Sequence, residues 1–95
     1  MLTPSFEWDL SKAELNLARH GVAFEEAVTV FTDPLAVVHS DPDHSLDEHR
    51  ALLIGHSEMG RLLIVSFADR GSTIRLISAR PVTKYERHRY EENAR

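Results

Sequence analysis

The chain has 95 residues and a mass of 10.8 kDa, which suits one small domain spanning residues 1–95. Its hydrophobic fraction of 42% and charged fraction of 27% are typical of a globular protein and exclude a disordered chain. The absence of cysteine excludes a disulfide scaffold and a thiol nucleophile. No apolar run exceeds four residues and no secretory signal is visible, so we expect a cytoplasmic protein without a membrane span.

Charge is unevenly distributed along the chain. Residues 1–58 hold three lysines and arginines against eleven acidic residues, whereas residues 59–95 hold eight against four. Such asymmetry indicates an anionic ligand near the C-terminal half and a separate acidic surface elsewhere. A solvated surface of mixed charge is the alternative interpretation.

The N-terminal third predicts one short strand followed by two helices. Ser11 and Glu14 have the spacing of a capping box, and Gly21 is suited to end the first helix in the left-handed conformation. Asp33-Pro34 should end the second helix, whose apolar residues recur at helical spacing. The predicted elements are a strand at Phe6–Trp8, a helix from Ser11 to His20 and a helix from Phe24 to Phe31.

The rest of the chain predicts four strands and a final helix. Turn-rich segments separate the strands, which favours hairpins in series, and the fold class is therefore α+β with a mostly antiparallel sheet. Strict alternation along the last strand places Arg75 and Arg80 on opposite faces. The predicted strands are Leu35–Ser40, Ala51–Gly55, Arg61–Ala68 and Thr73–Arg80, and the C-terminal helix covers Thr83–Asn93.

One acidic loop is a weak candidate for a metal site. It contains Asp41, Asp43, His44, Ser45, Asp47, Glu48 and His49. The calcium-loop pattern fails because Leu46 stands at the sixth position and Leu52 at the twelfth. Two histidines among carboxylates suit zinc, but no helical pair of ligands is present. We interpret the loop as a solvated acidic segment and predict no metal and no cofactor.

Two groups of basic residues are better candidates for a functional site. Lys12, Asn16 and either Arg19 or His20 share one helix face, and Lys12 lies in the first turn, where the helix dipole disfavours a cation. The second group is Arg75, Arg80, Lys84, Arg87, His88 and Arg89. Guanidinium groups around a cleft suit phosphodiesters. Solvated helix surfaces with ordinary ion pairs are the alternative for both groups.

The ordered succession of short motifs resembles the BrnT-type toxins of bacterial type II toxin–antitoxin systems. The resemblance covers roughly residues 6–90. It is carried by Phe6-Glu7-Trp8-Asp9, Lys12, Asn16, Arg19-His20-Gly21-Val22, Phe24-Glu25-Glu26-Ala27, Val30-Phe31-Thr32-Asp33-Pro34-Leu35, Asp41-Pro42-Asp43-His44-Ser45, Arg50, Ile54-Gly55, Gly60-Arg61-Leu62-Leu63, Ile74-Arg75-Leu76-Ile77-Ser78-Ala79-Arg80, Glu86-Arg87 and Tyr90.

The resemblance implies a RelE-like fold and a ribonuclease that stops translation. It also implies a ribbon-helix-helix antitoxin that neutralises the toxin, with two toxins on an antitoxin dimer that binds operator DNA. The catalytic residues implied by matched position are Lys12, His20, Arg61, Arg75, Arg80 and Glu7. For contacts with RNA we add Arg19, Lys84 and Tyr85.

RNA cleavage without metal uses the ribose 2′-hydroxyl as nucleophile, so these residues need only move protons and stabilise charge. His20 or Glu7 is the candidate base, and Lys12 stabilises charge or acts as the acid. Tyr85 is a candidate for stacking on a base or for donating a proton. The main alternative is an inactive toxin-fold subunit that acts only in an antitoxin–DNA complex. A metalloenzyme centred on the acidic loop is a third.

Overall fold

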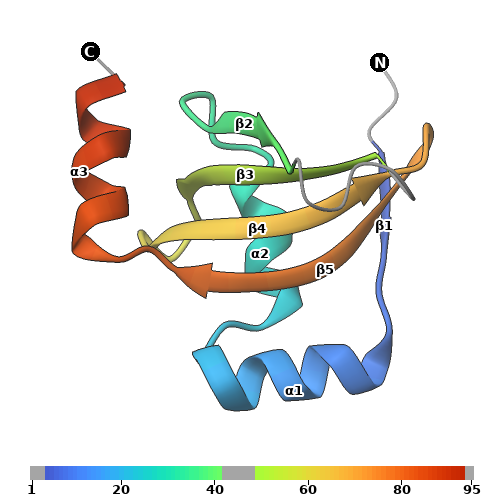
Figure 1. Ribbon diagram of the computed structural model, residues 1–95. Coiled ribbons are helices and arrows are strands. Elements are labelled where there is room, and N and C mark those ends of the chain that lie inside the picture. The colour runs from blue at the N-terminus through green and yellow to red at the C-terminus, as the bar shows by residue number, and fades with distance from the viewer. Residues whose placement is uncertain (1–3, 42–48, 94–95) are drawn as a thin grey trace.

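The computed structural model describes residues 4–41 and 49–93, which form three helices and one five-stranded sheet (Figure 1). The expected order of strands and helices is confirmed. Most of the acidic loop, residues 42–48, lies outside the described residues. The elements are β1 (Ser5–Glu7), α1 (Leu10–His20), α2 (Phe24–Val30), β2 (Val37–Ser40), β3 (Arg50–His56), β4 (Leu62–Asp69), β5 (Thr73–Pro81) and α3 (Lys84–Asn93).

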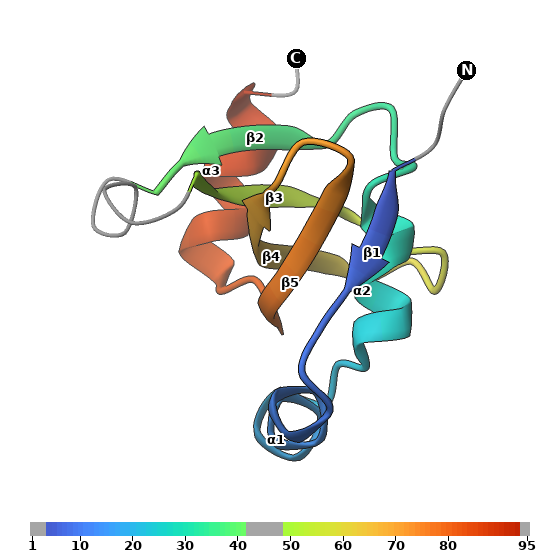
Figure 2. The same ribbon diagram turned by 90° about the vertical axis from the view of Figure 1, so that its right-hand side faces the viewer.

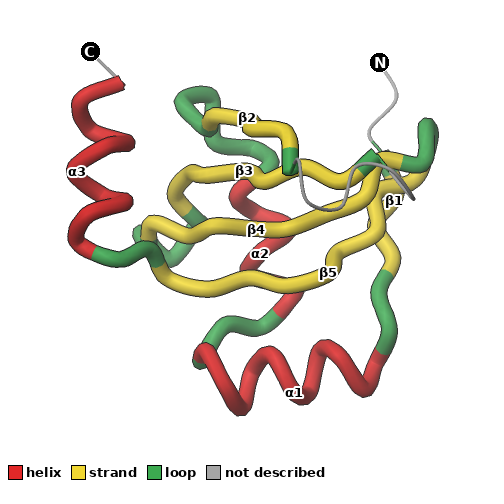
Figure 3. The backbone as a smooth tube through the Cα atoms, viewed as in Figure 1, coloured by secondary structure: helices red, strands yellow, loops and turns green. Residues whose placement is uncertain are grey.

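The sheet has the strand order β1-β5-β4-β3-β2 (Figure 3). The antiparallel meander from β2 to β5 is confirmed. The sequence did not predict that β1 pairs with β5 in parallel, with Glu7 opposite Arg75. This pairing covers only residues 73–75 of β5. Along the rest of the same edge, β5 has no strand of the described chain beside it and contacts α1.

The helices are divided between the two sides of the sheet. Figure 2 shows α2 and α3 on opposite sides, with α1 beside the β1–β5 edge. The hydrophobic core lies between α2 and one sheet face, and its fully buried members include Phe24, Val30, Leu63 and Val65. Burying each such side chain stabilises the fold by about 1.5–3 kcal/mol.

The first helix begins at Leu10, one residue earlier than predicted, and the predicted N-cap is wrong. Asp9, not Ser11, is the N-cap, and its carboxylate accepts a hydrogen bond from the backbone N–H of Lys12 at 3.0 Å. A carboxylate at the helix N-terminus also interacts favourably with the helix dipole. At the other end Gly21 has φ of 68°, as predicted, and its N–H bonds to the carbonyl of Leu17.

An irregularity in β5 overturns the predicted separation of Arg75 from Arg80. Arg75 pairs with Ala68 and Arg80 with Ile64, both on the face of β4 opposite the core. The register shifts between Ser66 and Phe67, which leaves Ile77 as an extra residue in β5. A bulge of this kind breaks the period of two, so both arginines lie on one face. We call it the second face.

The C-terminal helix is attached to the rest of the fold at few points. It begins with a capping box in which Glu86 accepts from the N–H of Thr83 at 2.8 Å and Thr83 Oγ1 accepts from the N–H of Glu86 at 3.1 Å. Tyr90 is the buried residue of α3, and its hydroxyl donates to the carbonyl of Leu35. Burial raises the pKa of Tyr90, which keeps this donor protonated.

Asn16 fixes α1 against the sheet. Its amide nitrogen donates to the carbonyls of Ala79 and Val22 at 2.8 and 2.9 Å, and its amide oxygen accepts from the N–H of Ala79 at 3.0 Å. The side chain is buried, with 6% of the residue exposed. Asn16 therefore bonds to β5 as a neighbouring strand would.

We predict that Asn16→Ala lowers the free energy of unfolding by about 2–4 kcal/mol, because the variant leaves the buried polar groups of Ala79 and Val22 unpaired. Urea unfolding measures the change. Asn93→Ala, at an exposed position in α3, is the matched control and should change stability by less than about 0.5 kcal/mol. Equal stability of the two variants would contradict the role given to Asn16.

Candidate functional site

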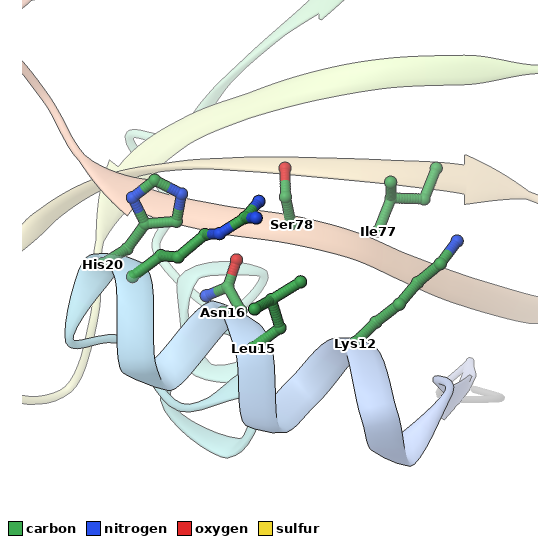
Figure 4. Close-up of a pocket in the computed structure, with 7 residues that line it drawn as sticks. Lys12, Leu15, Asn16, His20, Ile77 and Ser78 are labelled. Atoms are coloured by element: carbon green, nitrogen blue, oxygen red, sulfur yellow. The ribbon is translucent and has the colours of Figure 1, made fainter.

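The helix α1 and the bulged part of β5 enclose a small pocket of about 130 Å³ (Figure 4). Lys12 and His20 extend from α1 toward β5, one near each end of the strand segment that carries Ile77 and Ser78. We call this the α1–β5 pocket. It is lined by Lys12, Leu15, Asn16, Arg19, His20, Ile77 and Ser78.

The pocket is lined by basic side chains, and no carboxylate from the described residues lines it. Within residues 4–41 and 49–93, no acidic side chain forms an ion pair with Lys12, Arg19 or His20. Arg19 and His20 lie in the last turn of α1, where the helix dipole favours cations, but Lys12 lies in the first turn, where it does not. An anion in the pocket would therefore gain interactions that the folded chain does not supply itself.

Arg75 and Glu7 form an ion pair on the second face at the edge of the pocket strand. Nη1 of Arg75 lies 2.6 Å from Oε2 of Glu7, and Nη1 of Arg70 lies 4.0 Å from the same oxygen. The parallel pairing of β1 with β5 places these side chains together. Glu7 does not line the α1–β5 pocket; it holds the guanidinium of Arg75.

Arg80 is held more tightly, at the other end of the second face. Its two terminal nitrogens each bond to one carboxylate oxygen of Glu86 at 2.8 Å. This bidentate contact, together with the capping bonds of Thr83, lowers the pKa of Glu86 to about 2, and Glu86 in turn raises the pKa of Arg80.

The remaining predicted RNA contacts lie on α3. Lys84 is exposed in its first turn. Tyr85 is 68% exposed, and its hydroxyl accepts a hydrogen bond from Nη1 of Arg89 at 3.0 Å. An exposed aromatic ring beside a guanidinium suits stacking on a nucleobase.

Arg61 lies outside the α1–β5 pocket. Its Nε donates to Oε2 of Glu26 at 3.0 Å, and Nη2 donates to the carbonyl of Gly21 at 2.9 Å. Glu26 is buried, and the hydrogen bonds from Arg61 hold its pKa below the ordinary range despite that burial. Because Gly21 follows His20, Arg61 ties the C-terminal end of α1 to the start of β4.

The structure thus gathers Lys12, Arg19 and His20 in one pocket. The sequence did not predict that Asn16 bonds to β5, that Ser78 lines the pocket or that Glu86 pairs with Arg80. Glu86 could have been found from Thr83, since the two have capping-box spacing, whereas the bulge that places Ser78 leaves no local signal. Among the described residues no group of three or more metal-binding side chains is present.

Comparison with known proteins gives the family of this chain, which has a pocket lined by basic residues beside a small, mostly antiparallel sheet. Residues 8–86 match the model of a family described as the ribonuclease toxin BrnT of type II toxin–antitoxin systems. The chain therefore belongs to the BrnT family, as the sequence resemblance predicted.

A solved structure agrees with this assignment. The crystal structure of the Brucella abortus ribonuclease toxin BrnT is 26% identical in sequence and superimposes with a TM-score of 0.68. The match covers 86% of this chain and 100% of the Brucella chain. No curated protein sequence matches the chain. No helix within the described ranges has the length and apolar character needed to cross a bilayer.

We predict that Glu86→Gln removes part of the acid sensitivity of the fold. Because the pKa of Glu86 is about 2 in the folded chain and ordinarily 4.5, its stabilising effect is complete above that ordinary value and is lost as pH falls towards 2. Near neutral pH the variant should be less stable by about 1–2 kcal/mol, since partial exposure weakens the pair.

Urea unfolding of both proteins from near neutral pH down to about pH 2 measures this effect. The difference in stability between wild type and Glu86→Gln should shrink as the pH falls. Glu91→Gln, an exposed neighbour in α3, should follow the wild-type profile. A constant difference at every pH would contradict the assignment.

Proposed function

We propose that this protein cleaves RNA at the α1–β5 pocket without a metal ion, and that cleavage inhibits translation. The observation that carries this proposal is the set of Lys12, Arg19 and His20, which line one pocket without an acidic partner among the described side chains. RNA presents one negative charge per phosphate, and positioned cations stabilise the additional charge that develops on phosphorus.

In the proposed reaction the ribose 2′-oxygen attacks the adjacent phosphorus, and the bond from phosphorus to the 5′-oxygen breaks. The products are a 2′,3′-cyclic phosphate and a 5′-hydroxyl. One proton leaves the 2′-hydroxyl and one reaches the departing oxygen. His20 is the residue of the pocket suited to moving these protons, because one ring nitrogen of an imidazole accepts a hydrogen bond or proton while the other donates one. Lys12 and Arg19 stabilise the phosphorane.

The other predicted residues act around this centre. Arg75 and Arg80 extend the cationic surface along β5 and bind neighbouring phosphates, with Glu7 orienting Arg75. Lys84 and Tyr85 contact the RNA from α3. Arg61 is a positioning residue that acts through the C-terminal end of α1.

The second candidate function is that of an inactive binding subunit within an antitoxin–DNA complex. One observation favours it: Arg61, Arg75 and Arg80 are each paired with a carboxylate, which offsets part of their charge toward a phosphate. Expression of this chain alone separates the two functions, because growth arrest with RNA degradation requires an active enzyme.

The family assignment implies an antitoxin partner. We propose that this partner carries a ribbon-helix-helix domain, that its dimer holds two toxin chains, and that the complex binds operator DNA through the antitoxin. Residues 1–95 act in it as a single toxin domain. Since the antitoxin would bind only the folded toxin, it should raise the melting temperature.

We predict that Lys12→Ala and His20→Ala each reduce the rate of RNA cleavage by about 100-fold or more, because each removes a group that acts on the transition state. Both side chains are on an exposed helix surface, so the circular dichroism spectrum and the melting temperature should change little. Arg87→Ala, which removes an exposed cation of α3, is the control and should keep nearly full activity. Full activity of either pocket variant would remove that residue from the site.

We predict that cleavage persists in excess EDTA, because the 2′-hydroxyl mechanism needs no Lewis acid. The assay compares rates on a single-stranded RNA before and after chelation. A chimeric substrate with a 2′-deoxyribose at the cleaved position should be resistant, which tests the nucleophile independently. Loss of activity in EDTA that one divalent cation restores would overturn the mechanism.

A further inference from the structure

The flank of α1 that faces α2 exposes an apolar groove. Two hollows of about 230 and 460 Å³ join there, and both are lined by Leu17, Ala23 and Glu25. Leu10 and Met59 lie at its two ends, in one hollow each. Leu10, Leu17 and Met59 are 75%, 52% and 72% exposed. We call this surface the α1–α2 groove.

The rim of the groove is acidic. Glu14, Glu25 and Glu58 line it and are exposed, and none of the three forms an ion pair within the part of the chain that the structure describes. The fourth glutamate, Glu26, is neutralised by Arg61. The groove therefore carries uncompensated negative charge around exposed apolar side chains.

The groove and the α1–β5 pocket lie on different flanks of one helix. Leu10, Glu14 and Leu17 are spaced by four and three residues and share one flank. Lys12 and Arg19, spaced by seven residues, lie on the flank that lines the pocket. A ligand in the groove thus leaves the pocket open, and the two surfaces attract ligands of opposite charge.

We propose that the α1–α2 groove is the docking surface for a basic segment of the antitoxin, whose apolar side chains contact Leu10, Leu17 and Met59. Lysine or arginine residues of that segment would face the three free glutamates. Exposed apolar patches with polar rims are typical of protein–protein contacts, and charge complementarity speeds association and selects the partner.

Charge and composition disfavour other occupants. RNA and anionic lipid surfaces are repelled by the acidic rim. A second copy of this chain offers helix α3, but its lysine and arginines are balanced by its glutamates, its large apolar residues are only Tyr85 and Tyr90, and Tyr90 is already buried. The choice of an antitoxin as partner rests on the proposed function.

The test measures binding of the cognate antitoxin by isothermal titration calorimetry. Leu17→Ser with Met59→Ser removes apolar contacts in the groove, and Glu58→Lys reverses one rim charge. The matched controls are Leu35→Ser with Val38→Ser, also exposed apolar positions, and Glu91→Lys in α3. We expect each groove variant to weaken binding by about tenfold or more, and each control by less than about twofold.

A second readout separates this surface from the active site. The groove variants should cleave RNA at the wild-type rate in the absence of antitoxin, whereas Lys12→Ala should bind antitoxin normally and fail to cleave. Wild-type affinity in the groove variants would overturn the docking surface and leave the ribonuclease proposal intact. A wild-type toxin that binds antitoxin through the groove but cleaves no RNA would overturn only the proposed activity.

Size-exclusion chromatography with light scattering tests the remaining possible occupant, a second copy of this chain. A free toxin that is dimeric in the wild type and monomeric in Leu17→Ser with Met59→Ser would assign the groove to a second copy and overturn the proposal. We expect a monomer in both.

Discussion

The arrangement of the site depends on the three hydrogen bonds of one buried amide. Asn16 reaches from α1 to the backbone of Ala79 and Val22 and satisfies groups on β5 that a sixth strand would otherwise pair. An edge strand with unpaired backbone groups invites association with other chains. By occupying that edge, Asn16 both protects β5 and holds the cations of α1 beside it.

Electrostatic pairing divides the basic residues into two kinds. Arg61, Arg75 and Arg80 are each fixed by a carboxylate from another element, whereas Lys12, Arg19 and His20 lack such a partner in the described chain. The bidentate pairs of Arg61 and Arg80 fix the geometry of these two guanidinium groups, whereas Arg75 contacts one oxygen of Glu7. The three basic side chains without a carboxylate partner among the described residues keep their interactions available for a ligand. The net charge of the chain, which is negative, does not reveal which basic residues are paired with carboxylates.

Local signals in the sequence predicted the elements, and long-range contacts limited the prediction of the site. Gly21 marks the end of α1 through its own backbone preference, which no distant residue needs to support, whereas α2 ends at Val30, before the predicted stop at Asp33-Pro34. The parallel pairing of Glu7 with Arg75 joins residues far apart in the chain, and no local pattern specifies it. Asn16 could be placed on the correct helix face, but its partner Ala79 could not be foreseen.

The extra residue in β5 has a consequence for how this strand tolerates change. Because Ile77 is the extra residue, deleting it would restore a regular ladder with β4 and would leave Arg75 on the face that carries Ser78 and Arg80. An amino-acid exchange at Ile77 would likewise leave unchanged which residues of β5 share a face. The division of side chains between the two faces therefore does not depend on keeping the bulged residue, and the contribution of the bulge to this site is local, at Ile77 and Ser78 in the pocket lining.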